Sequence, residues 1–279
     1  MVNRLLAFLT DPAGQHHPEL MIWLLVYGTI PLVRHLINRA QDTPAGDNGR
    51  LGVLRNVNPD WLLPREYIQP SIQIVRFGTE PRRVLVCFTG NGLRPNIALQ
   101  LYHLHAAKYF DCLIYLRDHR KQRFAEGIVG VASNISGLNA YLAQLIPQGC
   151  FISVMGVSGG GLAATRFAES AGANRLLLFS PPLTYKSNSA LGARSALDPE
   201  AVRLCFANRN GYDRDLAVEW TNTAYAPGIR MLATNSHGTL AYLFSRGGMD
   251  DVFRWLRGDI AEPYAAALGE ALLHQVSRV

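Results

Sequence analysis

Seven short apolar runs alternate with longer stretches of helical spacing, and this alternation constrains the fold more than any other feature of the chain. Helical spacing is found, for example, at residues 97–109 and 133–145. Short buried strands separated by helices indicate an α/β architecture, a mostly parallel sheet with helices on both faces. In such a sheet reactive groups collect at the carboxyl ends of the strands. The strand-like runs are residues 72–77, 84–89, 112–116, 151–155, 175–179, 202–206 and 229–233.

Composition limits the chain to a globular protein with modest excess positive charge. Its 279 residues suffice for one α/β domain with a full core, and 48% are apolar against 17% charged. The formal charge of +6 fits an anionic substrate, an acidic carrier or a membrane surface, although a solvated basic face is the commoner explanation. No nucleic-acid partner is expected.

The cysteine pattern gives no sign of a metal site. The four cysteines show no CxxC spacing and no paired histidine pattern, so we expect no metal site. Each lies in or beside an apolar run, where a cysteine behaves as a small core residue, so we expect reduced thiols in a cytoplasmic protein. They are Cys87, Cys112, Cys150 and Cys205.

The N-terminal region contains an apolar segment at residues 20–33, bounded by Glu19 and Arg34. It is shorter than the roughly 20 residues that span a bilayer, and Gly28 and Pro31 weaken it as a helix. A buried or docking helix is the favoured interpretation, and an interfacial membrane anchor is the alternative. Turn-forming residues at 41–50 then predict a boundary between an N-terminal helical arm (1–50) and a catalytic domain (51–279).

The run at 151–155 leads directly into Gly-Val-Ser-Gly-Gly, followed by a helical stretch from Leu162. This is Gly-x-Ser-x-Gly between a strand and a helix. A serine on so sharp a turn leaves no room for side chains two residues before or after it, and its hydroxyl projects above the sheet. We therefore predict that Ser158 is a nucleophile, in preference to a simple glycine-rich turn.

A serine hydroxyl needs a base and an orienting acid. Where this motif occurs, both follow the serine in the chain, the acid before the histidine. His237 lies in the loop after the last strand-like run and is the predicted base. The acid should follow the run at 202–206, where Asp213 is preferred over Asp215. Asp213 could instead cap a helix that begins at Arg214 or Asp215, and Asp215 is also explicable by the helix dipole.

Two backbone segments are candidates for stabilising an oxyanion. One is the N–H of Gly159, directly after the nucleophile. The other is the glycine-containing loop after the run at 84–89, where Gly90 or Asn91 could present a second N–H. An ordinary strand-to-helix turn is the alternative reading of that loop.

With these residues in place, the region 84–256 resembles the α/β-hydrolase superfamily. More narrowly, it is similar to bacterial hydrolase-like proteins associated with surface polysaccharides, some of which are O-acetyltransferases. The resemblance implies an α/β-hydrolase fold and esterase, thioesterase or acyl-transfer activity through Ser158, Asp213 and His237, without metal or organic cofactor. The matching stretches are Phe88-Thr89-Gly90, Leu116-Arg117-Asp118 with Gly127-Ile128, residues 155–161, Phe179-Ser180-Pro181, and His237 with Leu240 and Gly247-Gly248.

Many relatives carry a sizeable lid before the acid-bearing strand, but here only residues 180–200 lie between the two strands. We expect a small or absent lid and a site that is open, or covered by the N-terminal arm, which favours a bulky, carrier-bound or glycan acyl substrate. A basic stretch at 117–123 also follows a strand. Arg117, Arg120 and Lys121 are candidates for binding an anionic substrate group, with a solvated loop as the commoner alternative.

The leading functional prediction is a serine hydrolase or acyl transferase that acts on an ester or thioester through an acyl-enzyme on Ser158. The choice between water and a sugar hydroxyl as acceptor stays open. Two alternatives remain: a non-catalytic binding protein that keeps the fold, and a membrane-associated lipase-like enzyme that makes peripheral membrane contact through residues 20–33.

Overall fold

The computed structural model describes residues 66–262 except 70, 78, 98 and 184–196. The chain divides into two compact units, one formed by Met1–Pro64 with Ala98–Leu104 and the other by Arg65–Ile97 with His105–Val279. The apolar segment at 20–33, the predicted linker at 41–50 and most of the expected lid region lie outside the described residues. No helix in the described part of the chain is long and apolar enough to cross a membrane.

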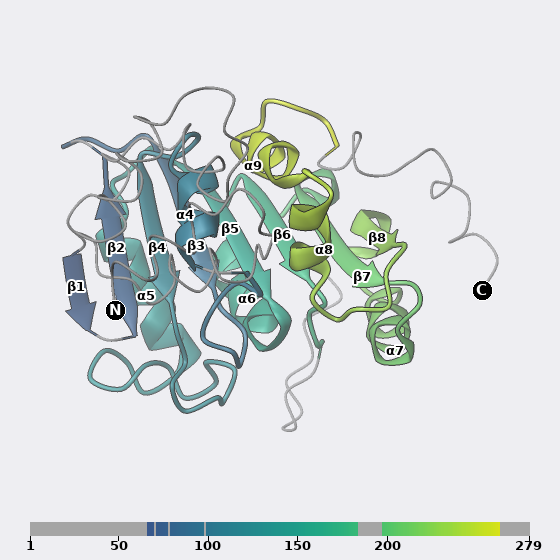
Figure 1. Ribbon diagram of the computed structural model, residues 1–279. Coiled ribbons are helices and arrows are strands. Elements are labelled where there is room, and N and C mark those ends of the chain that lie inside the picture. Colours follow the sequence, from purple (N-terminus) through teal and green to yellow (C-terminus); the bar gives the residue numbers. More distant parts are fainter. Residues whose placement is uncertain (1–65, 70, 78, 98, 184–196, 263–279) are drawn as a thin grey trace, which may run out of the picture. The chain divides into compact units, whose positions relative to one another are not determined.

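The second unit is built on an eight-stranded sheet with the order β1-β2-β4-β3-β5-β6-β7-β8 (Figure 1). β2 runs antiparallel to both β1 and β4, whereas every pairing from β4 to β8 is parallel. This order and these directions are those of the α/β-hydrolase fold. The strands are β1 (Glu66–Gln69), β2 (Ile72–Arg76), β3 (Arg83–Phe88), β4 (Cys112–Leu116), β5 (Phe151–Val157), β6 (Arg175–Phe179), β7 (Val202–Ala207) and β8 (Ile229–Leu232).

All seven predicted strands are present, each within two residues of its expected bounds. They form because their apolar side chains are covered on both faces; for example, all five residues of β4 are buried. The described helices are α4 (Leu99–Ala106), α5 (Ile135–Leu145), α6 (Gly161–Ala171), α7 (Gly211–Trp220), α8 (Thr239–Ser245) and α9 (Met249–Arg257), with 3-10 turns η3 (Ser158–Gly160), η4 (Pro199–Ala201) and η5 (Ala226–Gly228).

Helices cover both faces of this sheet, as two residues of β5 demonstrate. A β-carbon on Gly156 would lie 2.7 Å from Cβ of Ala164 in α6. Ser153, three positions earlier, donates its hydroxyl to the carbonyl of Leu256 in α9 at 2.6 Å. Successive side chains of a strand point to opposite faces, so α6 and α9 pack on opposite sides of β5 (Figure 1).

The main hydrophobic core lies on the α6 side. It joins Val86 and Phe88 of β3 to Phe167 of α6, Leu138 of α5 and Trp220 of α7. Cys87, Cys112 and Cys205 are buried, and Cys150 is half-buried and donates its Sγ–H to the carbonyl of Pro81 at 2.9 Å. These cysteines therefore contribute to packing.

The same core holds the carboxyl ends of β5, β6 and β7 next to one another.

Candidate active site

Ser158 sits at the turn between β5 and α6, in a backbone conformation with φ of 45°. A positive φ is unfavourable for a residue with a side chain and persists only where the surroundings enforce it. Gly160 shows how tightly they do so, because a β-carbon there would lie 2.5 Å from the carbonyl oxygen of Phe88 and 2.7 Å from that of Thr89. The missing side chain lets the turn sit directly against the end of β3.

His237 reaches Ser158 from the loop between β8 and α8. Its Nε2 lies 3.0 Å from Oγ of Ser158, a hydrogen-bond distance. The loop is fastened locally, since the N–H of Thr239 donates to the carbonyl of His237 at 2.9 Å. It is also joined to the loop after β7, where the N–H of Arg209 donates to the carbonyl of Thr234 at 3.0 Å. Two loops far apart in sequence are thus held side by side.

Asp213 completes the line of contacts, with Oδ1 2.5 Å from Nδ1 of His237. Its carboxylate is fully buried, and Oδ2 accepts from the Ser180 hydroxyl at 2.7 Å and from the N–H of Ala207 at 2.9 Å. The structure thus brings the predicted Ser158, His237 and Asp213 together, while the rival Asp215 is exposed.

The helix that carries Asp213 begins three or four residues earlier than predicted. α7 starts at Gly211, and its N-cap is Asn210, whose side chain accepts from the N–H of Asp213 at 3.2 Å. Because the cap is supplied by Asn210, the Asp213 carboxylate is not needed for capping. It turns instead toward His237.

Burial of the Asp213 carboxyl would by itself raise its pKa. Hydrogen bonds from His237, Ser180 and the N–H of Ala207 outweigh this effect, so the pKa of Asp213 lies below its ordinary value. The carboxylate is therefore ionised at neutral pH. An ionised acceptor holds the proton of the imidazole on Nδ1, which leaves Nε2 free to accept a proton from Ser158.

Ser180 contacts this group of side chains, and the sequence analysis did not single it out. It directly follows β6, has a φ of 48° and is fully buried. Besides donating to Asp213, its hydroxyl lies 3.2 Å from the carbonyl oxygen of His237 and 3.2 Å from Oγ1 of Thr239. A polar residue at the carboxyl end of a central strand is the signal that could have identified it.

The segments predicted to bind an oxyanion lie against the turn. A β-carbon on Gly90 would lie 3.3 Å from Cβ of Ser158, and one on Gly159 would lie 2.8 Å from Oδ1 of Asn91. The loop after β3 therefore reaches the space beside the serine hydroxyl. At the same site, 35% of the His237 side chain is exposed.

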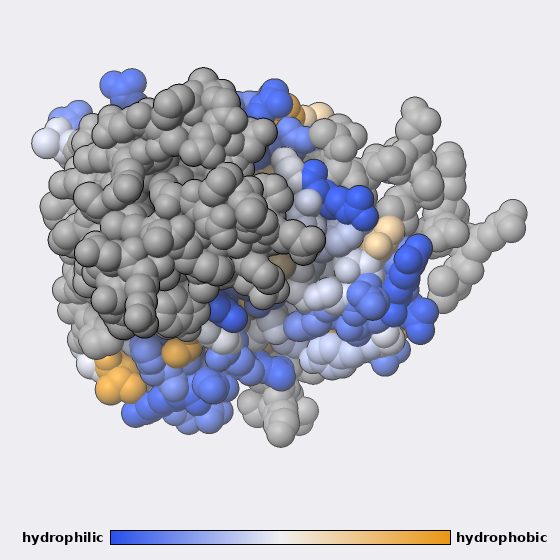
Figure 2. All heavy atoms as spheres, in the orientation of Figure 1, coloured by the Kyte–Doolittle hydropathy of each residue, from blue (hydrophilic) through white to orange (hydrophobic). Residues whose placement is uncertain are grey.

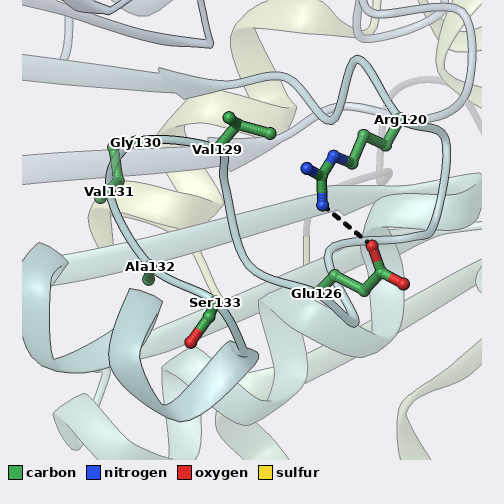
Figure 3. Close-up of a pocket in the computed structure, with 7 residues that line it drawn as sticks. All are labelled: Arg120, Glu126, Val129, Gly130, Val131, Ala132 and Ser133. Atoms are coloured by element: carbon green, nitrogen blue, oxygen red, sulfur yellow. Dashed lines mark hydrogen bonds and ion pairs between the residues drawn. The ribbon is translucent and has the colours of Figure 1, made fainter.

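The three basic candidates are engaged elsewhere or exposed. Arg117 donates to the side chain of Gln73 at 3.0 Å, and Lys121 is exposed. Arg120 pairs with Glu126 at 3.0 Å on the rim of a cavity of about 690 Å³, lined also by residues 129–133 (Figure 3). Arg123, at the end of this stretch, lies beside the turn, since a β-carbon added to Gly159 would lie 3.3 Å from its Cγ.

On the face shown in Figure 2 the described surface is mostly hydrophilic, with small hydrophobic patches. The exposed large hydrophobic side chains include Tyr212, which is 55% exposed and has its ring centroid 5.5 Å from that of His237. An aromatic side chain thus borders the imidazole at the surface. In the described residues no group of three or more His, Cys, Asp or Glu side chains could hold a metal ion.

No protein-family model and no curated protein matches the chain. Among solved structures it is similar to an alpha-beta serine hydrolase homologue from Coxiella burnetii, with 14% identity, 71% of this chain and 97% of that chain covered, and a TM-score of 0.47. It is also similar to a fluorophosphonate-binding serine hydrolase of Staphylococcus aureus, with 11% identity, 70% and 99% covered, and a TM-score of 0.44.

A third similar structure is an esterase of the bacterial hormone-sensitive lipase family, with 11% identity, 83% of this chain and 98% of that chain covered, and a TM-score of 0.46. These identities and TM-scores are low. The fold is therefore assigned from the strand order and strand directions of the chain itself.

Proposed function

We propose that this chain is a serine hydrolase that cleaves carboxylic esters or thioesters through an acyl-enzyme on Ser158. The observation that carries this proposal is the continuous line of contacts from Oγ of Ser158 to Nε2 of His237 at 3.0 Å, and from Nδ1 of His237 to the buried Asp213 carboxylate. Nucleophile, base and orienting acid in this order are the requirements of acyl transfer through serine.

In the first half-reaction, Oγ of Ser158 attacks the substrate carbonyl carbon while its proton passes to Nε2 of His237. The tetrahedral intermediate collapses as the bond to the leaving oxygen or sulfur breaks, and the leaving group takes the proton from Nε2. Asp213 stays ionised throughout and stabilises the imidazolium. In the second half-reaction, water adds to the acyl carbon and gives its proton to Nε2, which returns it to Oγ of Ser158 as the acid leaves.

The negative charge that develops on the carbonyl oxygen is stabilised by backbone N–H groups. Gly159 supplies one, and the adjacent Gly90 or Asn91 supplies the other, since this loop contacts the turn. Such a donor contributes about 3 kcal/mol to lowering the barrier. No metal or organic cofactor has a role in this chemistry.

The acceptor we propose is water. Transfer to a sugar hydroxyl requires that water be kept from the acyl-enzyme, whereas 35% of the His237 side chain is exposed. An open approach also admits an acyl group presented on a bulky, carrier-bound or glycan substrate.

Labelling with a fluorophosphonate probe, followed by mass analysis of the modified peptide, tests this proposal. We expect one adduct on Ser158 in the wild type and none in Ser158→Ala. Absence of labelling in a folded wild-type protein, or equal labelling of the variant, would count against a nucleophilic serine. A protein that is inert to both the probe and a panel of acyl esters would instead favour a non-catalytic binding role.

A further inference from the structure

The first turn of α7 holds an aromatic side chain at the surface, beside the imidazole of His237. Tyr212 is 55% exposed, its ring centroid lies 5.5 Å from that of His237, and the two ring planes are inclined by 53°. A single exposed hydrophobic residue needs no explanation by itself. Tyr212 is different because its neighbour is the side chain that transfers protons in the proposed mechanism.

Hydrogen bonds on both sides of Tyr212 fix its place relative to the imidazole. The next residue, Asp213, contacts Nδ1 of His237 through its buried carboxylate. Two residues before Tyr212, Asn210 caps the helix through Oδ1 and donates its Nδ2–H to the carbonyl of Asn235 at 3.1 Å. Asn235 belongs to the same loop as His237, so the helix end and this loop are joined at two points.

The leaving group of the substrate must approach the same imidazole. In the proposed mechanism Nε2 of His237 gives its proton to the leaving oxygen or sulfur, which requires a separation of about 3 Å. The Nδ1 side of the ring is taken by the buried Asp213 carboxylate, and 35% of the His237 side chain is exposed. The leaving group therefore departs along the exposed part of the imidazole. A ring attached two or three bonds beyond the leaving atom can then reach Tyr212.

The surroundings of Tyr212 favour a flat ring over an alkyl chain as its binding partner. In the described residues the other exposed large hydrophobic side chains are Val129 and Val218. Val129 lines the cavity beside Arg120 (Figure 3), and Val218 lies six positions further along α7, about 9 Å along the helix axis. Tyr212 is thus a single flat surface and not one wall of an apolar pocket. A planar ring contacts such a surface with a whole face, and aromatic pairs gain free energy beyond the area that they bury.

We infer that Tyr212 is a specificity-determining residue that binds an aromatic ring in the leaving alcohol or thiol of the substrate. The ring stacks on Tyr212 while the bond from the acyl carbon to the leaving oxygen or sulfur breaks and Nε2 of His237 supplies the proton. The contact is lost when the leaving group departs, so it acts on acylation and not on hydrolysis of the acyl-enzyme. This inference rests on the proposed function, because it concerns the ester or thioester that Ser158 attacks.

Esters that share one acyl group and differ only in the alcohol test the inference. The alcohols are ethanol, 2-cyclohexylethanol and 2-phenylethanol, which are all primary and have similar pKa values. The acyl group is that of the 4-nitrophenyl ester, in the series from acetate to octanoate, that the wild type hydrolyses fastest. Titration of the released acid at constant pH gives kcat/KM for each ester, which compares their acylation transition states. The cyclohexyl group is the bulkier and more apolar of the two rings, so simple burial would favour it.

We expect the wild type to prefer the phenylethyl ester over the cyclohexylethyl ester by roughly three- to tenfold in kcat/KM, the range for stacking of two aromatic rings. Tyr212→Ala should abolish this preference and keep kcat/KM for the ethyl ester within about threefold of the wild type. Tyr212→Phe should retain the preference. Tyr212→Trp should retain or increase it, which a misfolded protein cannot do.

Two controls separate binding of the leaving group from general support of the active site. Val218→Ala truncates a side chain of the same helix that is also 55% exposed, and it should change none of the three values. The rate constant for hydrolysis of the acyl-enzyme, measured after the burst of nitrophenolate, should be the same in Tyr212→Ala as in the wild type, because the leaving group is absent from that step.

Three results would overturn the inference and leave the proposed function intact, provided that a fluorophosphonate labels Ser158. They are a wild type that does not prefer the phenylethyl ester or hydrolyses none of the three, an unchanged preference in Tyr212→Ala, and an equal loss in Tyr212→Ala for all esters and for hydrolysis of the acyl-enzyme. The last result would mean that Tyr212 supports the imidazole. No hydrolysis of any ester together with no labelling would overturn both.

Discussion

Two serines occupy equivalent places on neighbouring strands, but their hydroxyls meet different partners. Ser158 follows β5 and Ser180 follows β6, the two strands pair in parallel up to Val157 and Phe179, and the serines have φ values of 45° and 48°. Ser158 is half-buried and meets the Nε2 of an imidazole, whereas Ser180 is fully buried and donates to a carboxylate. Backbone shape alone does not make a nucleophile.

The difference lies in the partner of each hydroxyl. A neutral imidazole nitrogen can take a proton from Ser158 and release it again. The ionised Asp213, whose pKa lies below its ordinary value, accepts the hydrogen bond of Ser180 without taking the proton. The same side chain thus meets a base at one strand end, where we propose that it is the nucleophile, and donates to a carboxylate at the next.

Removing each hydroxyl in turn is the most direct test of this difference between Ser158 and Ser180. Ser158→Ala should lower kcat on a nitrophenyl ester by a factor on the order of 10⁵–10⁶, because the acyl-enzyme cannot form. Ser180→Ala should still be labelled by a fluorophosphonate. Labelling lost equally in both variants, with native circular dichroism, would contradict the assignment of the nucleophile.

Asp213 contacts both His237 and Ser180, and removing its charge should lower kcat nearly as much as removing the Ser158 hydroxyl. Asp213→Asn should lower kcat by roughly 10⁴-fold, since an amide can hold the imidazole in the wrong tautomer. The matched control is Asp215→Asn on the exposed side of α7, which should keep kcat within about twofold. Steady-state kinetics on one ester measures both, and equal losses would remove the distinction between the two aspartates.

Loss of the Ser180 hydroxyl should have a smaller effect. Ser180→Ala removes a hydrogen bond to a charged group, worth about 1.5–3 kcal/mol, and should lower kcat roughly 10-fold with little change in KM. Ser180→Gly also lacks the hydroxyl but relieves the positive φ. We expect the Ser180→Gly protein to unfold at a higher denaturant concentration than the Ser180→Ala protein, but to have the same lowered kcat. Full activity in Ser180→Gly would show that Ser180 serves only the backbone conformation.

The smallest expected effect is on stability at acid pH. Asp213 has a lower pKa in the folded chain than in the unfolded one, so the unfolded state takes up its proton first as pH falls. The stability that this carboxylate contributes is therefore complete above the unfolded value of about 3.9 and is lost as pH falls from there through the folded pKa. Urea unfolding of the wild type and Asp213→Asn between pH 6 and 3 should show the two converging below about pH 4.

The sequence allowed most of the sheet to be predicted, because strands buried on both faces are continuous apolar runs. β1 was missed: its sequence Glu-Tyr-Ile-Gln has no such run, and it pairs only with β2 at the edge. The start of α7 was placed too late because Gly211 is typical of turns, whereas Asn210 supplies the cap.

The choice of Ser158, Asp213 and His237 followed from chain order and strand ends, which a sequence displays directly. Ser180 also follows a strand end, but its position alone does not say which group its hydroxyl contacts. Its contact with Asp213 depends on the direction of its side chain at a positive φ, which leaves no periodic pattern in the sequence.

The contact of Gly160 with two main-chain oxygens of the neighbouring strand end has a consequence for reading related genes. A homologue could retain the serine, the aspartate and the histidine and still be inactive if this glycine were replaced by alanine. The added methyl group would displace the turn from the end of β3. The proposed activity therefore depends on the glycine two places after the serine as well as on the serine, the aspartate and the histidine.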